Sequence, residues 1–281
     1  MQNYCYLISK KTFNHKNIIN RSHLSFLEYR YYDFDKKGLY LEGMLEDLDK
    51  AERGTIVVLH VCAHNPTGMD PTQSEWDSIL KVVQDRGLFP FFDMAYQGFS
   101  SGDLDKDAYS LRKFADTGMN MCLAQSFAKN FGLYGQRIGC FSLITGNTKE
   151  AIAAESHIKF IARSQYSNPP KNGGLIVDII LNSPELTAEW HRELKVMANR
   201  INSMRQALYE NIKKSGSKLN WDHIINQIGM FAYTGCNLEQ VQRLKNEFHI
   251  YMTNDGRISI SGLNTSNVEY VAKCFHEVTK N

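Results

Sequence analysis

The sequence lacks a long apolar run, a strong charge of either sign and any cysteine pair of the CxxC type. Its longest apolar runs, residues 55–62 and 140–145, are well short of the ~20 residues that a membrane-spanning helix needs. The net charge is only +2, because 32 basic residues are offset by 30 acidic ones. We therefore expect neither a membrane protein nor a nucleic-acid-binding protein.

Cysteine and proline are both scarce, with six of each. Several of the cysteines lie in apolar runs, so we expect free, buried thiols in a reducing compartment rather than disulfides or a metal site. The chain has no low-complexity tract or internal repeat, which argues against a long flexible linker. Its first ten residues show no charged stretch followed by an apolar one, so we expect no targeting segment there.

Short apolar runs alternate with amphipathic segments in the first half of the chain. We predict strands at residues 4–8, 25–31, 55–62, 89–93, 119–123 and 138–145. A helix is predicted from residue 70 to about 86, with Asp70 as its cap, Pro71 at its first position and Gln73 completing a capping box. A second helix is expected at about 106–116. This alternation predicts an α/β domain in three layers with a mostly parallel sheet.

Helices dominate after residue 146. We predict them at 149–160, 172–181 and 184–214, and an apolar stripe along the last one indicates core packing: Leu186, Trp190, Leu194, Ala198, Ile201 and Met204. Shorter elements follow at 229–233, 238–248, 251–253, 257–260 and 268–279, which together predict a compact α+β part. We therefore predict a large domain at 1–182 and a smaller C-terminal domain at 183–281.

Three polar residues lie at or just past the carboxyl ends of different predicted strands. They are Asn65, Asp93 and Lys129. Each has an ordinary explanation alone, as a turn residue, a capping carboxylate and a surface lysine, but that edge of a parallel sheet is where ligands bind. Lys129 is also followed by a glycine-rich turn and, eight positions on, by Arg137. This pattern suits a lysine that holds a carbonyl cofactor covalently and an arginine that holds its phosphate.

Several motifs carry a resemblance to a known family. They are His64-Asn65-Pro66-Thr67-Gly68, Asp93-Met94-Ala95-Tyr96, Ser126-Phe127-Ala128-Lys129, Gly135-Gln136-Arg137-Ile138-Gly139, Tyr166-Ser167-Asn168-Pro169-Pro170, Gly229-Met230-Phe231 and Asp255-Gly256-Arg257. From about residue 25 to its C-terminus the chain resembles the aspartate aminotransferases, pyridoxal-phosphate enzymes of the class I aminotransferase family. Segments 227–231 and 250–253 are more similar to the mitochondrial than to the cytosolic form. The resemblance implies fold type I of the pyridoxal-phosphate-dependent transferases, and the mitochondrial matrix or the cytoplasm as location.

The resemblance also implies how the cofactor, pyridoxal 5'-phosphate, is held. Lys129 would form the Schiff base with it and later move the proton at the substrate α-carbon, and Asp93 would pair with the cationic ring nitrogen. The resemblance implies that His15 contacts Asp93 from behind and that Asn65 and Tyr96 form hydrogen bonds to the phenolic oxygen. It also implies phosphate contacts from Ser126 and Arg137, and Phe13 at the position of a ring-stacking tryptophan.

Substrate recognition follows from the same resemblance. Arg257 would bind the α-carboxylate, Phe231 would line the pocket, and Arg163 would reach the site of a partner subunit to bind the side-chain carboxylate. Two guanidinium groups suit dicarboxylic substrates. The implied protein is a homodimer that transfers an amino group between L-aspartate and 2-oxoglutarate by ping-pong kinetics. The family pattern also extends upstream of Met1, where we expect a Ser/Gly/Thr loop and a tyrosine that contact phosphate.

Two other interpretations remain open from the sequence. One is a non-catalytic relative that keeps the scaffold in a dimerising or regulatory role. The other is a class I aminotransferase for a different substrate, such as an aromatic amino acid. Covalent labelling of Lys129 by the cofactor distinguishes an aspartate aminotransferase from the first alternative. The relative turnover of aspartate and phenylalanine distinguishes it from the second.

Overall fold

The computed structural model describes residues 5–10 and 13–280. Its helices and strands are, in chain order, β1 Cys5–Ser9, α1 Phe13–Arg21, β2 Ser25–Tyr29, β3 Tyr32–Asp33, β4 Gly38–Leu39, α2 Leu41–Asp49, β5 Ile56–His60, α3 Gln73–Arg86, β6 Phe89–Met94, α4 Leu104–Asp107, α5 Tyr109–Ala115, β7 Met121–Ser126, β8 Gly139–Ile144, α6 Thr148–Tyr166, α7 Lys171–Leu181, α8 Pro184–Lys214, α9 Asp222–Asn226, β9 Phe231–Tyr233, α10 Leu238–Phe248, β10 Arg257–Ser259 and α11 Val268–Thr279.

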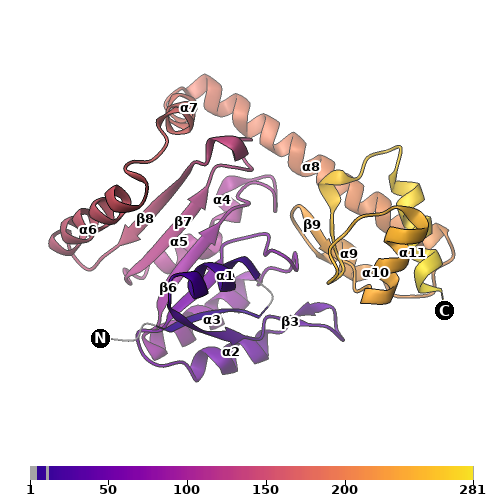
Figure 1. Cartoon of the computed structure of the whole chain (residues 1–281), viewed down its shortest axis with the longest axis horizontal. Coiled ribbons are helices and arrows are strands. Elements are labelled where there is room, and N and C mark those ends of the chain that lie inside the picture. The colour runs from indigo at the N-terminus through magenta and orange to yellow at the C-terminus, as the bar shows by residue number, and fades with distance from the viewer. Residues whose placement is uncertain (1–4, 11–12, 281) are drawn as a thin grey trace.

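One six-stranded sheet organises the first part of the chain, in the order β2-β1-β5-β6-β7-β8 (Figure 1). The first five strands in that order are parallel, as predicted, and β8 is antiparallel to β7. The β7–β8 connection contains only a short 3-10 turn at Tyr134–Gln136 and no crossover helix, so the chain returns in the opposite direction. The sheet is therefore mostly parallel.

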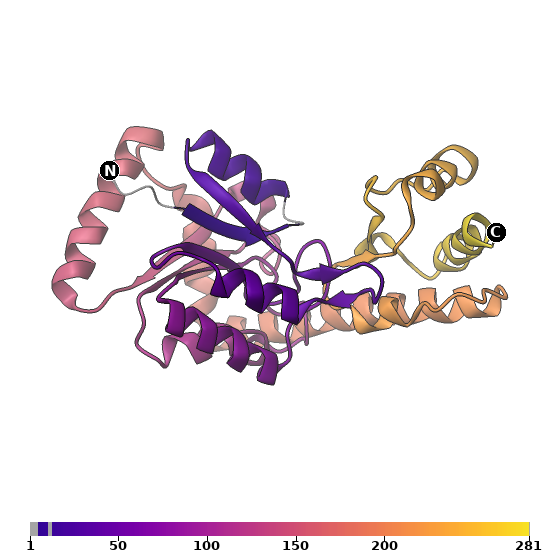
Figure 2. The same cartoon turned by 90° about the horizontal axis from the view of Figure 1, so that it is seen from below.

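Side chains alternate between the two faces of the sheet, and each face has its own helices. Leu7, Val57 and Phe92 belong to the core that α2, α3 and α5 cover. Their sequence neighbours Ile8 and Val58 pack instead with Ile19 of α1. Figure 2 shows the indigo α1 and the purple α2 and α3 on opposite sides of the sheet, which confirms three layers.

The start of α3 differs from the prediction. Thr72 is the N-cap and shares a capping box with Glu75, so neither Asp70 nor Gln73 has the predicted role. Pro71 accordingly precedes the helix instead of occupying its first position. The carboxylate of Asp70 accepts hydrogen bonds from the backbone of Ala63 and His64. The Asp70 side chain, which we expected to cap the helix, thus binds two amides of the preceding turn instead.

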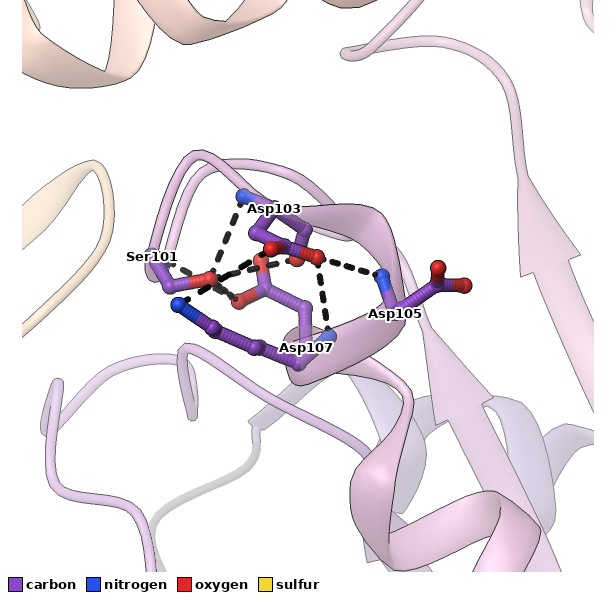
Figure 3. A network of polar contacts seen from close by, with 5 residues as sticks. Ser101, Asp103, Asp105 and Asp107 are labelled. Carbon is purple, nitrogen blue, oxygen red and sulfur yellow. Dashed lines mark hydrogen bonds and ion pairs between the residues drawn. The ribbon is translucent and has the colours of Figure 1, made fainter.

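The helix predicted at about 106–116 is two helices, α4 and α5. Asp103 caps α4, and Asp107 at its end accepts hydrogen bonds from Ser101 (Figure 3). The Asp107 carboxylate also accepts hydrogen bonds from the backbone N–H groups of Gly98 and Ser100. This carboxylate ties the loop after β6 to α4, and the helix is interrupted at Ala108, where φ is −91° and ψ is 7°. Two short helices, with hydrogen bonds from Asp107 to the preceding loop, therefore replace the one continuous helix that was expected.

The long helix α8 has the predicted bounds and connects the sheet to the C-terminal part (Figure 1). Leu194, Ala198, Ile201 and Met204 of its stripe are buried, whereas Leu186 is exposed and Trp190 is partly buried. The C-terminal core, which includes Leu208, Ile224 and Phe275, also contains Tyr96 and Phe99 from the sheet part. Because this one core combines residues from both sides of the proposed boundary, the division at 182/183 stays a prediction.

Two further expectations need correction. Cys140 is exposed because it lies on β8, the edge strand of the sheet, and Cys5 at the start of β1 is partly exposed. Cys62, Cys122, Cys236 and Cys274 are buried and free as expected. Segment 251–253 forms neither helix nor strand. Within the described ranges, no helix combines the length and apolar character that crossing a membrane would require.

Candidate functional site

The three polar residues singled out at the strand ends line one cavity of about 630 Å³. Asn65 lies in the turn after β5, Lys129 lies in the loop after β7, and Asp93 belongs to β6 itself, one residue before its end. The other lining residues are Asn14, His15, Asn17, His60, Pro66, Ala95, Tyr96, Thr253, Asn254, Asp255 and Arg257. Parallel strands bring their carboxyl ends to one edge, and the C-terminal part closes the cavity with residues 253–257.

Asp93 is held as an anion at this edge. His15 Nε2 donates to Asp93 Oδ2 at 2.9 Å. Burial alone would raise the pKa of Asp93, but the hydrogen bond from His15 and the charges of His60, His15 and Lys129 outweigh it, and the pKa is lower than the ordinary 3.8. The cavity therefore presents a carboxylate that attracts a cationic group.

Lys129 presents an amine to the same cavity. Its Nζ lies 4.8 Å from the ring centroid of Tyr96 and 5.8 Å from that of Tyr134. Partial burial and the positive charge of Arg137 lower the pKa of Lys129, although Asp93 acts in the opposite direction. An ammonium group with a lowered pKa gives up its proton more readily, which a nucleophilic or basic amine requires.

Asn65, Tyr96 and Arg257 form a hydrogen-bonded chain across the cavity wall. Arg257 Nη1 donates to Asn65 Oδ1 at 2.7 Å, and Asn65 Nδ2 donates to the Tyr96 hydroxyl oxygen at 3.3 Å. Burial raises the pKa of Tyr96 to about 12, so its hydroxyl keeps a proton to donate. The Arg257 guanidinium lies 4.5 Å from the ring centroid of Phe231, which itself packs edge-on against Tyr96.

Ser126 and Arg137 line a second hollow of about 400 Å³ that shares Asp93 with the first cavity. Ser126 Oγ accepts a hydrogen bond from the amide of Ala128 at 3.2 Å. Arg137 is exposed and has a left-handed backbone with φ of 51°, and its Nη1 donates to the Tyr134 carbonyl at 3.0 Å. A hydroxyl and a guanidinium next to Asp93 form an environment suited to an anionic group.

Two predicted site residues, Arg163 and Phe231, line neither hollow; Phe231 packs instead against Arg257 and Tyr96, behind the cavity wall. Arg163 is exposed on α6 and donates to Ser167. Figure 1 shows α6 beyond β8, at the outer edge of the molecule. The side chain of Phe13 lies outside the described residues, so its proposed stacking position stays a prediction.

His60 is the main cavity residue that the sequence reasoning missed. It is the register partner of Asp93 in the neighbouring strand, so both side chains lie on the same face. Burial lowers the pKa of His60 to about 4, and its Nε2 is buried without a hydrogen-bond partner. His60 lies within the run 55–62, and the apolar character of that run predicts a strand but no site residue. A correct pairing register with 89–93 is the signal that would have found it.

His15, His60 and Asp93 have ligand atoms within 4.8 Å of one another, a spacing that one metal ion could bridge. However, His15 Nε2 already donates to Asp93. The arrangement is equally that of a carboxylate supported by imidazoles, facing an open cavity.

Comparison with known proteins identifies the family. The family model described as "Aminotransferase class I and II" matches residues 8–275. The mitochondrial aspartate aminotransferase of Schizosaccharomyces pombe is 51% identical over 269 residues, covering 95% of this chain and 62% of the relative. The Gallus gallus mitochondrial enzyme is also 51% identical, covering 95% and 63%. The chain thus spans about three fifths of the length of these curated relatives.

Solved structures of aminotransferases have the same fold as this chain. A mitochondrial aspartate aminotransferase from Trypanosoma brucei superimposes with a TM-score of 0.97 and 46% identity, covering 99% of this chain and 73% of that one. An aromatic-amino-acid aminotransferase from Burkholderia pseudomallei, covalently bound to pyridoxal phosphate, has a TM-score of 0.96 and 42% identity, covering 98% and 69%.

Proposed function

Because this chain belongs to the class I and II aminotransferase family, we propose that it carries the catalytic core of a pyridoxal-phosphate-dependent aspartate aminotransferase. Its fold is fold type I of the pyridoxal-phosphate-dependent transferases. The proposed reaction is the reversible transfer of an amino group between L-aspartate and 2-oxoglutarate.

The polar groups of the two hollows fit pyridoxal phosphate. Asp93 offers an anion for the protonated ring nitrogen, with His15 behind it. Asn65 and Tyr96 offer donors for the phenolic oxygen, and Ser126 and Arg137 offer contacts for the phosphate. When bound, the cofactor supplies a cationic ring that accepts the electron pair left on the substrate α-carbon. An anionic Asp93 stabilises this cationic ring, so its lowered pKa supports the assignment.

Lys129 is the proposed nucleophile and proton carrier. Its lowered pKa and its position on the cavity wall suit a side chain that first binds the cofactor covalently. Once an amino acid has displaced it, the neutral amine of Lys129 would accept the proton released from the substrate α-carbon and carry it within the cavity. The nearby Tyr96 hydroxyl, which stays protonated, holds the phenolic oxygen while this happens.

Two arginines are proposed to select dicarboxylic substrates. Arg257 is already in the cavity, fixed by its hydrogen bond to Asn65, and can pair with the α-carboxylate. Arg163 lies outside its own cavity and is exposed, which supports a role in the site of a partner subunit of a homodimer. Phe231, stacked under the Arg257 guanidinium, restricts its orientation. The acceptor is the 2-oxo acid of similar shape.

The observation that carries this proposal is the convergence of Lys129, Asp93 and the Asn65–Tyr96 pair on one cavity. The test is to add pyridoxal phosphate to the chain, reduce with borohydride and locate the label by mass spectrometry. We expect the label on Lys129, and none there in Lys129→Ala, while Lys159→Ala on the exposed α6 labels as the parent does. A parent chain without a label on Lys129 would instead favour the non-catalytic relative.

A second candidate is an aminotransferase for aromatic amino acids, which the likeness to the Burkholderia pseudomallei enzyme favours. Turnover of aspartate and phenylalanine with 2-oxoglutarate, measured on the same preparation, decides between them. Turnover of phenylalanine equal to or above that of aspartate would overturn the dicarboxylate assignment.

We also propose that the protein is located in the mitochondrial matrix, with the cytoplasm as the alternative. The names of the Schizosaccharomyces pombe, Gallus gallus and Xenopus tropicalis relatives support this location. Fractionation of the source cells with an antibody against the C-terminal part tests it, and recovery in the cytosolic fraction alone would overturn it.

A further inference from the structure

The turn at residues 63–70, between β5 and α3, is closed by the carboxylate of Asp70. Asp70 Oδ2 accepts a hydrogen bond from the Ala63 amide at 2.6 Å, and Oδ1 accepts one from the His64 amide at 2.8 Å. Thr72 caps α3, so Asp70 is not needed for that purpose. Asp70 does not line the cavity. Its two bonds therefore act only on the backbone immediately before Asn65.

The backbone of this turn is unfavourable without such support. Ala63 has a φ of 49°, in the left-handed region that a residue with a Cβ seldom adopts. Hydrogen bonds to a charged acceptor are stronger than those to a neutral one, so the Asp70 carboxylate holds this conformation effectively. The His64 imidazole is held in turn by Thr67 Oγ1 at 2.8 Å and by stacking on Tyr31 with a centroid distance of 3.9 Å.

The same turn connects the cavity to the C-terminal part. It carries Asn65, which contacts both Tyr96 and Arg257. The Gly68 carbonyl accepts a hydrogen bond from the Ile228 amide at 2.8 Å. Gly229 packs so closely that a Cβ there would lie 2.6 Å from the Ala63 Cβ. A shift of Ala63 would therefore move Asn65 and disturb the contact with residues 228–229 together.

We propose that Asp70 is a positioning residue, whose carboxylate sets the turn that presents Asn65 to the cofactor and to Arg257. The inference rests on the proposed function, since Asn65 matters through the groups it holds. It adds a residue outside the cavity to those that determine cofactor affinity.

The pKa of Asp70 lies in a pH range where the folded chain can be studied. Burial raises the pKa of Asp70 to about 6, the amides of His64 and Ala63 act against this, and Asp107 of α4 adds to it. The other titratable groups coupled to it are Tyr31 and Cys62, whose pKa values burial raises well above the ordinary ones, so both are neutral. Glu75 of α3 couples to Tyr31, and the pKa of His64 lies well below 6.5, so that ring is neutral too.

The sign of the pH effect separates positioning from stability. A carboxyl whose pKa is raised in the folded state adds stability when protonated, so acidification through about pH 6 favours the folded state at this residue. The same proton takes the anionic acceptor away from one of the two amides. A purely structural role predicts slower amide exchange in the turn at pH 5 than at pH 8. Positioning by the carboxylate predicts faster exchange at pH 5.

The experiment follows the Ala63 and His64 amides by NMR in the cofactor-free chain between pH 5 and 8. We expect both signals to shift with a midpoint near pH 6 and their hydrogen exchange, corrected for intrinsic rate, to be faster at the acidic end. In Asp70→Asn the transition should vanish and exchange should be about tenfold faster at pH 8, the consequence of one lost charged hydrogen bond. The matched control, compared at pH 8 where Asp70 is ionised with or without the Asp107 charge, is Asp107→Asn, which removes a buried carboxylate that holds three amides of another loop.

The second measurement is the pyridoxal phosphate affinity of the same three proteins. We expect a drop of about tenfold in Asp70→Asn and less than about twofold in Asp107→Asn. Equal losses in both variants, or amides of the parent that do not titrate, would overturn the inference. If the parent binds no cofactor, the proposed function fails, and the amide titration, which needs neither cofactor nor variant, still decides the role of Asp70.

Discussion

Arg257 donates a hydrogen bond to Asn65 across 192 positions of the sequence, at 2.7 Å. The donor lies on β10 in the C-terminal part and the acceptor lies in the turn after β5. The bond joins the two parts of the chain at the polar wall of the cavity, which both residues line. A substrate carboxylate that pairs with Arg257 therefore contacts a guanidinium whose orientation the other part of the chain has set.

Replacing this guanidinium should weaken substrate binding. We expect Arg257→Lys to raise the KM for aspartate and for 2-oxoglutarate by about 10-fold to 100-fold, because the lysine cannot bond a carboxylate and Asn65 at once and one charged hydrogen bond is lost. Steady-state kinetics with each substrate varied checks this. Arg243→Lys, in an exposed ion pair with Glu247, is the control and should change KM by less than about twofold. An unchanged KM in Arg257→Lys would contradict the assignment.

The charge of Asp93 should depend on His15. In the parent chain the pKa of Asp93 is below 3.8, so its contribution to cofactor binding is present above that pKa and is lost only as the pH falls through it. In His15→Phe the hydrogen bond is gone and burial remains, so the pKa rises and the loss begins at higher pH. We expect the affinity for pyridoxal phosphate to fall relative to the parent as the pH decreases from 8 to 5, with a loss of about tenfold at a pH one unit below the raised pKa.

The measurement is the cofactor dissociation constant between pH 5 and 8. His157→Phe, on the exposed α6, provides the control because it contacts none of the cavity residues. Parallel pH profiles for the parent and His15→Phe would show that His15 does not act through the charge of Asp93.

Lys129 should react with an acylating reagent at lower pH than an exposed lysine of the same chain. Partial burial lowers its pKa, whereas the ion pair with Asp77 raises the pKa of Lys113, which makes Lys113 an internal reference. Pulse acetylation followed by mass spectrometry gives both midpoints from one sample. Since Asp93 raises the pKa of Lys129, Asp93→Asn should move its midpoint further down. Identical midpoints for the two lysines would contradict the interpretation.

Arg205 should be important for the stability of the C-terminal part. It is 3% exposed and donates to the carbonyls of Ile224, Gly229 and Phe231, and burial lowers its pKa to about 10. Arg205→Met leaves three carbonyls without these donors, and we expect the free energy of unfolding to fall by about 3 kcal/mol. Urea unfolding measures it, with Arg243→Met as a control expected within about 0.5 kcal/mol of the parent. A loss no larger than that of the control would be inconsistent with this role.

The sequence was most informative where a local signal was strong. The bounds of α8, α10 and α11 agree with the predicted 184–214, 238–248 and 268–279, because long amphipathic periodicity is a local property. It failed where the backbone of a neighbouring loop bound a side chain that was expected to act within a helix. Asp70 looked like a helix cap and became the anchor of a turn, and Asp107 interrupted an expected helix by bonding to the loop at 98–101.

For the candidate site, the sequence by itself determined the chemistry: a lysine, an aspartate and an asparagine at strand ends, an arginine eight residues after the lysine, and motifs typical of one family. Only the tertiary structure decided which groups act together. The pairing of His60 with Asp93 depends on the register of two strands, and the contact of Arg257 with Asn65 depends on how α8 places the C-terminal part. These are long-range relations set by packing, and nothing in the local spacing of residues encodes them.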